Sequence, residues 1–168
     1  DLPGVKTQIP IYNELNVAAR IMEAACGMRY PAGLHEIQVL DDTAEKYKDL
    51  KPYQFHGSLY TLTAAKKGHL KPVGEWNQLR LVCRGPKIEV ELNGESVNEV
   101  NLDEWDTPKT NPDGSPNKFK KALKDFPRKG RIGFQNHGKV VWIRDGTVDK
   151  IEDREELSIS IGKIDTRH

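Results

Sequence analysis

Residues 87–94 read Lys-Ile-Glu-Val-Glu-Leu-Asn-Gly, and they combine a strict alternation with a turn signal. Ile88, Val90 and Leu92 alternate with charged residues, which is the period-2 pattern of a strand with one buried face. Asn93-Gly94 follows at once and favours the positive φ angles of a type I′ turn. The sequence therefore predicts a β-hairpin that pairs 87–92 with about 96–102.

Similar short alternating runs occur along the rest of the chain, separated by Gly, Pro and Asn. This pattern is typical of an all-β sandwich or barrel. Further strands are predicted at 15–22, 34–40, 57–63, 76–83, 130–135, 139–144 and 146–151. The tail 157–161 alternates once more and is expected to add an edge strand, although 152–156 before it look solvated.

Residues 103–130 interrupt the pattern, because prolines punctuate a lysine-rich stretch. Phe119, Leu123 and Phe126 within it are spaced as in a helix, so we expect a long excursion with one or two helical turns. The stretch 43–50 is the other candidate for a short helix. Helix is otherwise scarce.

The composition bounds the class of protein. A length of 168 residues suits one domain, and we treat 1–168 as a single unit. The net charge of +1 favours neither nucleic acid nor an anionic membrane as a partner. No apolar run is long enough for a membrane span, and no signal segment opens the chain, so we expect a soluble mature chain. Cys26 and Cys83 are interpreted as two buried thiols or as one disulfide, and oligomeric state is left open.

Glu36 and Gln38 are the first candidate site residues, because alternation places both on one face of the strand 34–40. A carboxyl group and an amide projecting together can hold and protonate a polyhydroxylated ligand. The alternative is an ordinary solvated face. Asp41 and Asp42 end this strand, where they could cap the following turn or bind a cation.

Histidines and aromatic residues supply the other candidates. His137 lies in Gln135-Asn-His-Gly138, between two predicted strands, and can act as acid, base or ligand near neutral pH. His56 precedes the strand that carries Tyr60, a mixture suited to stacking on sugar rings or to closing a core. The five histidines show no zinc spacing, and no nucleotide loop or serine elbow is present. We therefore predict no cofactor and no preformed zinc site, and a structural or catalytic divalent cation stays an open alternative.

Several of these motifs occur in an order that resembles a known family. They are Ala32-Gly-Leu-His-Glu-Ile-Gln-Val-Leu-Asp-Asp42, the run 44–60 ending in Phe55-His-Gly-Ser-Leu-Tyr60, Lys71-Pro-Val-Gly-Glu-Trp-Asn77, Asn93-Gly94, Gly130-Arg-Ile-Gly-Phe-Gln-Asn-His-Gly138 and Val141-Trp-Ile-Arg-Asp145. Together they resemble the 3-keto-disaccharide hydrolase domain of bacterial secreted proteins. The resemblance covers about 13–151 and leaves 152–168 as a C-terminal extension.

This resemblance implies a concanavalin A-like jelly roll of two antiparallel sheets with a concave, sugar-facing cleft. It implies a secreted or periplasmic location and a saccharide partner. Carried over, the family's Glu-x-Gln strand is Glu36 and Gln38, its Gly-Ser-x-Tyr strand is 57–60, and its Gln-x-His-Gly loop is 135–138. At 23–29 the chain keeps Gly27 and Arg29 of the family motif but lacks its Asn-Ser pair. Only about a dozen residues precede the family-like start.

The resemblance implies an enzyme that cleaves glycosidic bonds of 3-keto-glycosides, by hydrolysis or by elimination and water addition. On this hypothesis Glu36 and His137 form the acid–base pair. The predicted substrate contacts are Arg29, Gln38, His56, Tyr60 and Gln135. A non-catalytic carbohydrate-binding module is the alternative, and a structural or interaction domain is the third hypothesis.

Overall fold

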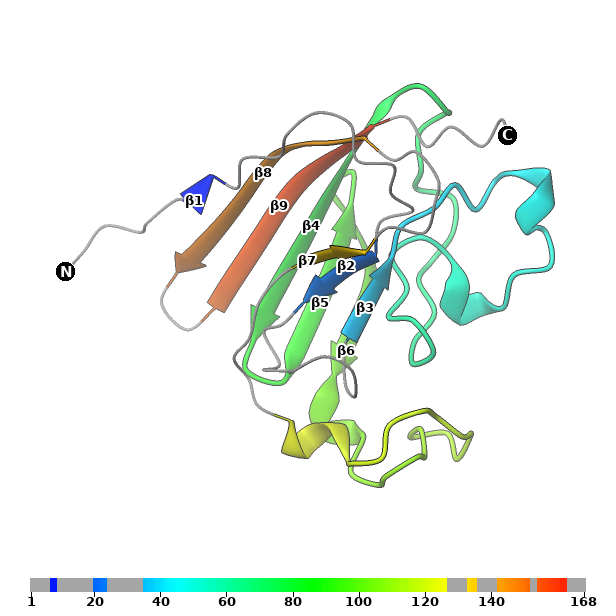
Figure 1. Cartoon of the computed structure of the whole chain (residues 1–168), viewed down its shortest axis with the longest axis vertical. Helices are drawn as coiled ribbons and strands as arrows, with labels where there is room; N and C mark the ends of the chain where they lie inside the picture. The colour runs from blue at the N-terminus through cyan, green and yellow to red at the C-terminus, as the bar shows by residue number, and fades with distance from the viewer. Residues whose placement is uncertain are drawn as a thin grey trace.

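The computed structural model describes residues 7–8, 20–23, 35–126, 133–135, 142–151 and 154–162, with side chains given mainly over 36–126. Two antiparallel sheets dominate this part of the chain (Figure 1). The strands are β1 (Thr7–Gln8), β2 (Arg20–Glu23), β3 (His35–Gln38), β4 (Trp76–Arg84), β5 (Lys87–Leu92), β6 (Glu95–Asn101), β7 (Gly133–Gln135), β8 (Trp142–Ile151) and β9 (Arg154–Gly162). Helix is limited, in the described residues, to the 3-10 turns η1 (Glu45–Tyr47), η2 (Pro52–Gln54), η3 (Leu102–Glu104) and η4 (Leu123–Asp125).

The larger sheet has six strands in the order β1-β8-β9-β4-β5-β6. Its β5–β6 hairpin is the one predicted from residues 87–94, and Asn93 and Gly94 adopt φ angles of 55° and 89°. These positive values are those that a type I′ turn requires. Leu79, Leu81, Ile88, Val90 and Leu92 face inward, so alternation predicted the buried face of this sheet correctly.

The C-terminal half of the larger sheet differs from expectation in two ways. The parts of the predicted strands 139–144 and 146–151 that the structure describes, 142–144 and 146–151, belong to one strand, β8, whose register with β9 shifts between Arg144 and Thr147. The two residues skipped there, Asp145 and Gly146, form an irregularity of the kind that glycine often marks in strands. The tail strand β9 lies between β8 and β4 rather than at an edge.

The smaller sheet has the order β3-β2-β7, and Figure 1 shows it lying in front of the larger sheet. Residues 57–60 continue it beyond β3, because Leu59 bridges Ile37. The Gln38 amide donates to the Ser58 carbonyl at 2.9 Å, and the Tyr60 amide donates to the Glu36 carbonyl at 2.8 Å. The predicted strand 57–63 is therefore extended only at its start, because the chain turns after Tyr60.

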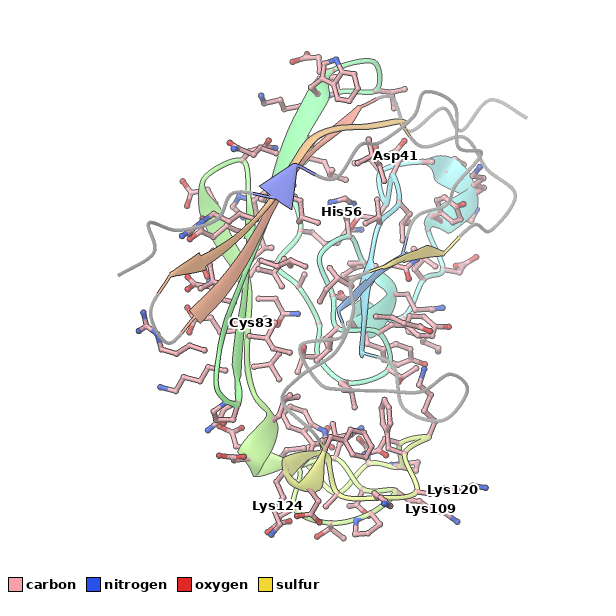
Figure 2. All side chains as sticks on the ribbon, turned by 60° about the vertical axis from the view of Figure 1, so that its left-hand side comes forward. Asp41, His56, Cys83, Lys109, Lys120 and Lys124 are labelled. Carbon is pink, nitrogen blue, oxygen red and sulfur yellow. The ribbon has the colours of Figure 1, made fainter. Side chains whose placement is uncertain are left out.

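The core lies between the two layers, as the side chains in Figure 2 show. Ile37, Val39 and Leu59 enter it from the smaller sheet, and the inward residues of β4, β5 and β6 meet them. Cys83 is buried on the inner side of β4. Cys26 lies outside the described residues, so the choice between two thiols and a disulfide stays a prediction.

The excursion, of which residues 103–126 are described, closes one end of this core. Trp105, Phe119, Leu123 and Phe126 are buried, and the Phe119 and Phe126 rings meet edge to face with centroids 5.9 Å apart. The expected helical turns are present as η3 at its start and η4 near its end. Four buried apolar side chains explain why this proline-rich segment is held against the sheets.

The described structure is mostly β, which agrees with the predicted class. Within the described residues, no helix has the length and apolarity that crossing a bilayer would require.

Candidate functional site

The register of the smaller sheet places predicted site residues in two rows across it. Gln38 lies opposite Arg20 of β2, and Arg20 lies opposite Gln135 of β7. In the next row, Glu36 lies opposite Met22, which lies opposite Gly133. Directly paired positions in a sheet share a face, so Glu36, Gln38 and Gln135 occupy one face although they are far apart in the sequence.

The segment 57–60 extends both rows on the other side of β3. The bridge between Ile37 and Leu59 places Tyr60 beside Glu36 and Ser58 beside Gln38. Ile37 and Leu59 are fully buried, so they mark the core face, and the site residues occupy the opposite one. The face defined by Glu36, Gln38, Tyr60 and Gln135 is called the candidate site below.

Two polar groups of the candidate site are withdrawn from water. The Glu36 residue is 8% exposed. The side-chain oxygen Oε1 of Gln38 is buried and has no hydrogen-bond partner. A buried acceptor without a donor is costly to a folded protein and is seldom retained without a reason.

Aromatic rings and a cation lie beside Glu36. The Tyr60 ring meets the ring of Tyr53 edge to face, with centroids 6.2 Å apart and an interplanar angle of 80°. The Lys118 ammonium lies 5.6 Å from the centroid of the Tyr60 ring and 3.8 Å from Oε2 of Glu36. Sequence reasoning missed Lys118, because nothing distinguishes it from the other lysines of the excursion.

The turn that follows Tyr60 is strained. Thr61 has a φ angle of 68°, which is unusual for a β-branched residue. Its hydroxyl oxygen is buried without a partner. Strained backbone is often found at functional sites, where the surrounding structure holds it in place. Thr61 therefore adds a second unsatisfied polar atom next to the candidate site.

His56, predicted to contact substrate, is buried with 2% of its surface exposed. Its Nδ1 atom lies 3.2 Å from the Leu40 amide nitrogen and 3.0 Å from the Leu40 carbonyl oxygen, so its tautomer decides which of the two it bonds. Burial lowers the pKa of His56, and the Leu40 backbone and the charges of Asp42 and Asp41 oppose that shift. As placed, the ring offers no surface to a saccharide, and the role that this geometry supports is structural.

Asp41 and Asp42 hold the loop that follows β3. This is the turn-capping role, one of the two roles predicted for them. Asp41 accepts hydrogen bonds from the amide and the hydroxyl group of Thr43. Asp42 accepts one from the His56 amide at 3.0 Å. No group of three or more potential metal ligands occurs among the described residues.

Three of the predicted site residues are described only in part or not at all. Gln135 is placed by its strand, and nothing is said of its side chain. Arg29 and His137 lie outside the described residues, so their roles stay predictions.

A hollow of about 700 Å³ lies elsewhere, on the outer face of the larger sheet. Its lining includes Arg80, Arg84, Lys87, Glu89 and Glu99, and none of its lining residues is aromatic. Charged side chains alternating on a strand are typical of a solvated face. The unsatisfied oxygen of Gln38 and the tyrosine rings favour the smaller sheet as the site.

Comparison with known proteins identifies the family of the chain. The sequence model of the 3-keto-alpha-glucoside-1,2-lyase-like domain matches residues 24–149. A crystal structure described as a "putative glycosyl hydrolase" from Parabacteroides distasonis is 29% identical, with a TM-score of 0.64 over 89% of this chain and 73% of that chain. A search of curated proteins gave no significant match. Because the match spans three quarters of the chain, including β3, the segment 57–60 and β7, the protein belongs to the family of 3-keto-alpha-glucoside-1,2-lyase-like domains.

Proposed function

We propose that this protein cleaves the glycosidic bond of 3-keto-glycosides by elimination across C1 and C2. The observation that carries the proposal is the face on which Glu36, Gln38 and Tyr60 meet, with the buried Gln38 oxygen lacking a donor. The family's lyase-like description supports a reaction of this type and a saccharide substrate. The strand register, in which Gln135 of β7 lies opposite Arg20, supports including this residue from a distant part of the sequence.

The chemistry begins at the C3 ketone, which acidifies the hydrogen on C2. A base removes that proton, and the electron pair forms an enolate whose charge rests on the C3 oxygen. When the enolate collapses, the pair forms the C1–C2 double bond and the C1–O bond breaks. The leaving oxygen takes a proton, and water can then add across the double bond to give the free 3-keto sugar.

Each predicted residue except the buried His56 has a proposed part in that sequence. Glu36 and His137 form the acid–base pair, one removing the C2 proton and the other protonating the leaving oxygen. The Gln38 oxygen accepts a hydrogen bond from a sugar hydroxyl group, which satisfies the acceptor that is buried without a partner. The Tyr60 ring, which is in edge-to-face contact with the ring of Tyr53, offers an apolar surface to the sugar ring. Arg29 and Gln135 remain proposed substrate contacts.

The finer fold assignment belongs to the same proposal. We infer a concanavalin A-like jelly roll, in which the smaller sheet supplies the sugar-binding face. The two antiparallel layers with a shared core and the similarity to a crystal structure at a TM-score of 0.64 support it.

The test compares a 3-keto-glucoside with its unoxidised parent glucoside, following release of the leaving group. Wild type is expected to turn over only the oxidised sugar. Glu36→Gln and His137→Ala are each expected to lower kcat by about 10²–10⁴-fold. Glu45→Gln is the matched control, since that carboxylate is exposed and pairs only locally with Lys48 at 3.0 Å. Unchanged turnover in both site variants would remove the assignment.

A saccharide-binding module without turnover is the second candidate, because the Tyr53–Tyr60 pair alone suits a lectin-like surface. Calorimetry with the same two sugars separates the candidates. Binding of both sugars without product favours the binding module, whereas binding coupled to release of the leaving group favours the enzyme.

A further inference from the structure

We propose that Lys118 supplies the cation that stabilises the enolate in the candidate site. The inference rests on the proposed function and adds a residue to it. Lys118 belongs to the excursion, which no motif connected with the site. Its ammonium reaches across to the smaller sheet and lies 3.8 Å from Oε2 of Glu36.

The backbone on both sides of Lys118 is held in place. The Asn117 amide donates to the Lys109 carbonyl at 2.9 Å, and the Phe119 amide donates to Oδ1 of Asn117 at 2.9 Å. The Phe119 side chain is 2% exposed and anchors the segment in the core. Because the backbone is held on both sides of Lys118, the Cα atom of this lysine has a fixed position, and the side chain can keep its ammonium beside Glu36.

The ammonium is also directed by the rings around it. It lies 5.6 Å from the centroid of Tyr60 and 5.4 Å from that of Phe119. Both distances are within the range of a cation–π interaction. Because its direct neighbours include a carboxylate and a tyrosine of the candidate site, the charge of Lys118 belongs to that site rather than to the outer surface.

The exposures of the two partners indicate a role beyond holding the fold. The side chain of Lys118 is 45% exposed, whereas that of Glu36 is 10% exposed. At 3.8 Å the contact is long for an ion pair, and its cationic partner is largely solvated, so holding the fold is not enough to explain it. The ammonium keeps an open side, on which a substrate oxygen could be accommodated beside Glu36.

The reaction needs such a charge. When the C2 proton leaves, negative charge develops on the C3 oxygen, and a fixed cation beside it lowers the barrier more than it strengthens binding of the ketone. Lys118 offers a positive charge near the carboxyl group proposed to take part in that proton transfer. The proton removed from C2 goes to the base, so Lys118 acts by its charge and exchanges no proton.

The experiment compares Lys118→Met and Lys118→Arg with Lys120→Met. Lys120 is two residues away and exposed, and Figure 2 shows it at the outer end of the excursion with Lys109. On a 3-keto-glucoside, Lys118→Met is expected to lower kcat about 10²–10³-fold with KM changed less than about threefold. Lys118→Arg is expected to recover part of that loss, and Lys120→Met to match wild type.

A second readout follows the enolate itself. Exchange of the C2 hydrogen of a 3-keto sugar in D₂O reports proton removal without bond cleavage, and it should slow in Lys118→Met in step with kcat. A purely structural role would lower the melting temperature and leave exchange per folded molecule unchanged, which overturns the inference. If wild type turns over the substrate and Lys118→Met is equally active, the inference about Lys118 is overturned and the proposed function stands. No wild-type turnover or exchange at all overturns the proposed function, and this inference with it.

Discussion

Gly57 lies where the segment 57–60 passes close to the larger sheet. Its φ angle is +79°, and a Cβ atom added there would lie 3.0 Å from Cγ2 of Val97 on β6. Two hydrogen bonds to β6 hold the chain in place near this contact. The Lys66 amide donates to the Val97 carbonyl at 2.9 Å, and Asn98 Nδ2 donates to the Gly57 carbonyl at 3.2 Å. The absence of a side chain at Gly57 therefore allows the segment 57–60, which carries Tyr60 of the candidate site, to pack closely against β6.

Gly57→Ala is expected to lower the free energy of unfolding by about 2–4 kcal/mol, because a left-handed backbone and a steric overlap add together. Gly68→Ala is the matched control. Gly68 also has a positive φ angle of +93°, but nothing lies within 4 Å of its added Cβ, so only the backbone term of about 1–2 kcal/mol should appear. Urea unfolding of both variants measures the difference, and equal losses would refute the close contact.

At this scale, alternation predicted that Glu36 and Gln38 share a face, and the structure confirms it because Ile37 between them is fully buried. Alternation could not predict that Lys118 lies beside Glu36. Its proximity to Glu36 depends on how a proline-rich segment folds back over the end of the core, and five lysines occur between 103 and 126. The burial of His56 was equally hidden, since a histidine next to aromatic residues fits a site and a core alike.

Among the elements, β9 connects two parts of the larger sheet. It pairs with β4 over nine residues, from Trp76 opposite Gly162 to Arg84 opposite Arg154, and it pairs with β8 on its other side. The family match ends at residue 149, before β9 begins. Without β9, nothing in the described sheet would join β1 and β8 to β4, β5 and β6.

A chain ending at Asp153 is therefore expected not to fold cooperatively, whereas one ending at Lys163, which keeps all of β9, should unfold like the full chain. Near-ultraviolet circular dichroism and urea titration distinguish the two. A cooperative transition with native aromatic signals in the shorter chain would show that β9 is dispensable.

The edge position expected for the tail was wrong for a physical reason. Period 2 indicates which residues of a strand share a face, but it carries no information on which strand lies alongside. The charged residues at 152–156 suggested that this part of the chain is exposed to solvent. Yet Glu156 lies opposite Val82, whose neighbours Leu81 and Cys83 are the buried ones, so Glu156 takes an outer-face position in an interior strand. One solvated face is enough to accommodate such residues.

At the scale of the whole molecule, we expect stability to depend on pH through His56. Its ring is buried, Nδ1 bonds the Leu40 backbone, and Nε2 has no partner. Protonation would place a charge on a buried ring, and burial is the main reason why the pKa of His56 lies below its ordinary value of 6.5. Above that value the imidazole is neutral in both the folded and the unfolded chain. Below it the unfolded chain binds the proton first, so stability is lost as the pH falls toward the lowered pKa of the folded state.

We expect the free energy of unfolding to decrease from pH 7.5 to 5.5, with a contribution from His56 of at most about 1.4 kcal/mol per pH unit. His56→Asn retains a side-chain amide that can bond the Leu40 backbone but cannot titrate, so the stability of this variant should be lower at pH 7.5 and less dependent on pH. His69→Asn serves as the control, because only the carbonyl of His69 takes part in a described hydrogen bond, from Asn93 at 2.7 Å. Urea titrations at five pH values measure the three curves. If the free energy of unfolding of His56→Asn changed with pH in parallel with that of wild type, His56 would not be the group that links proton binding to folding.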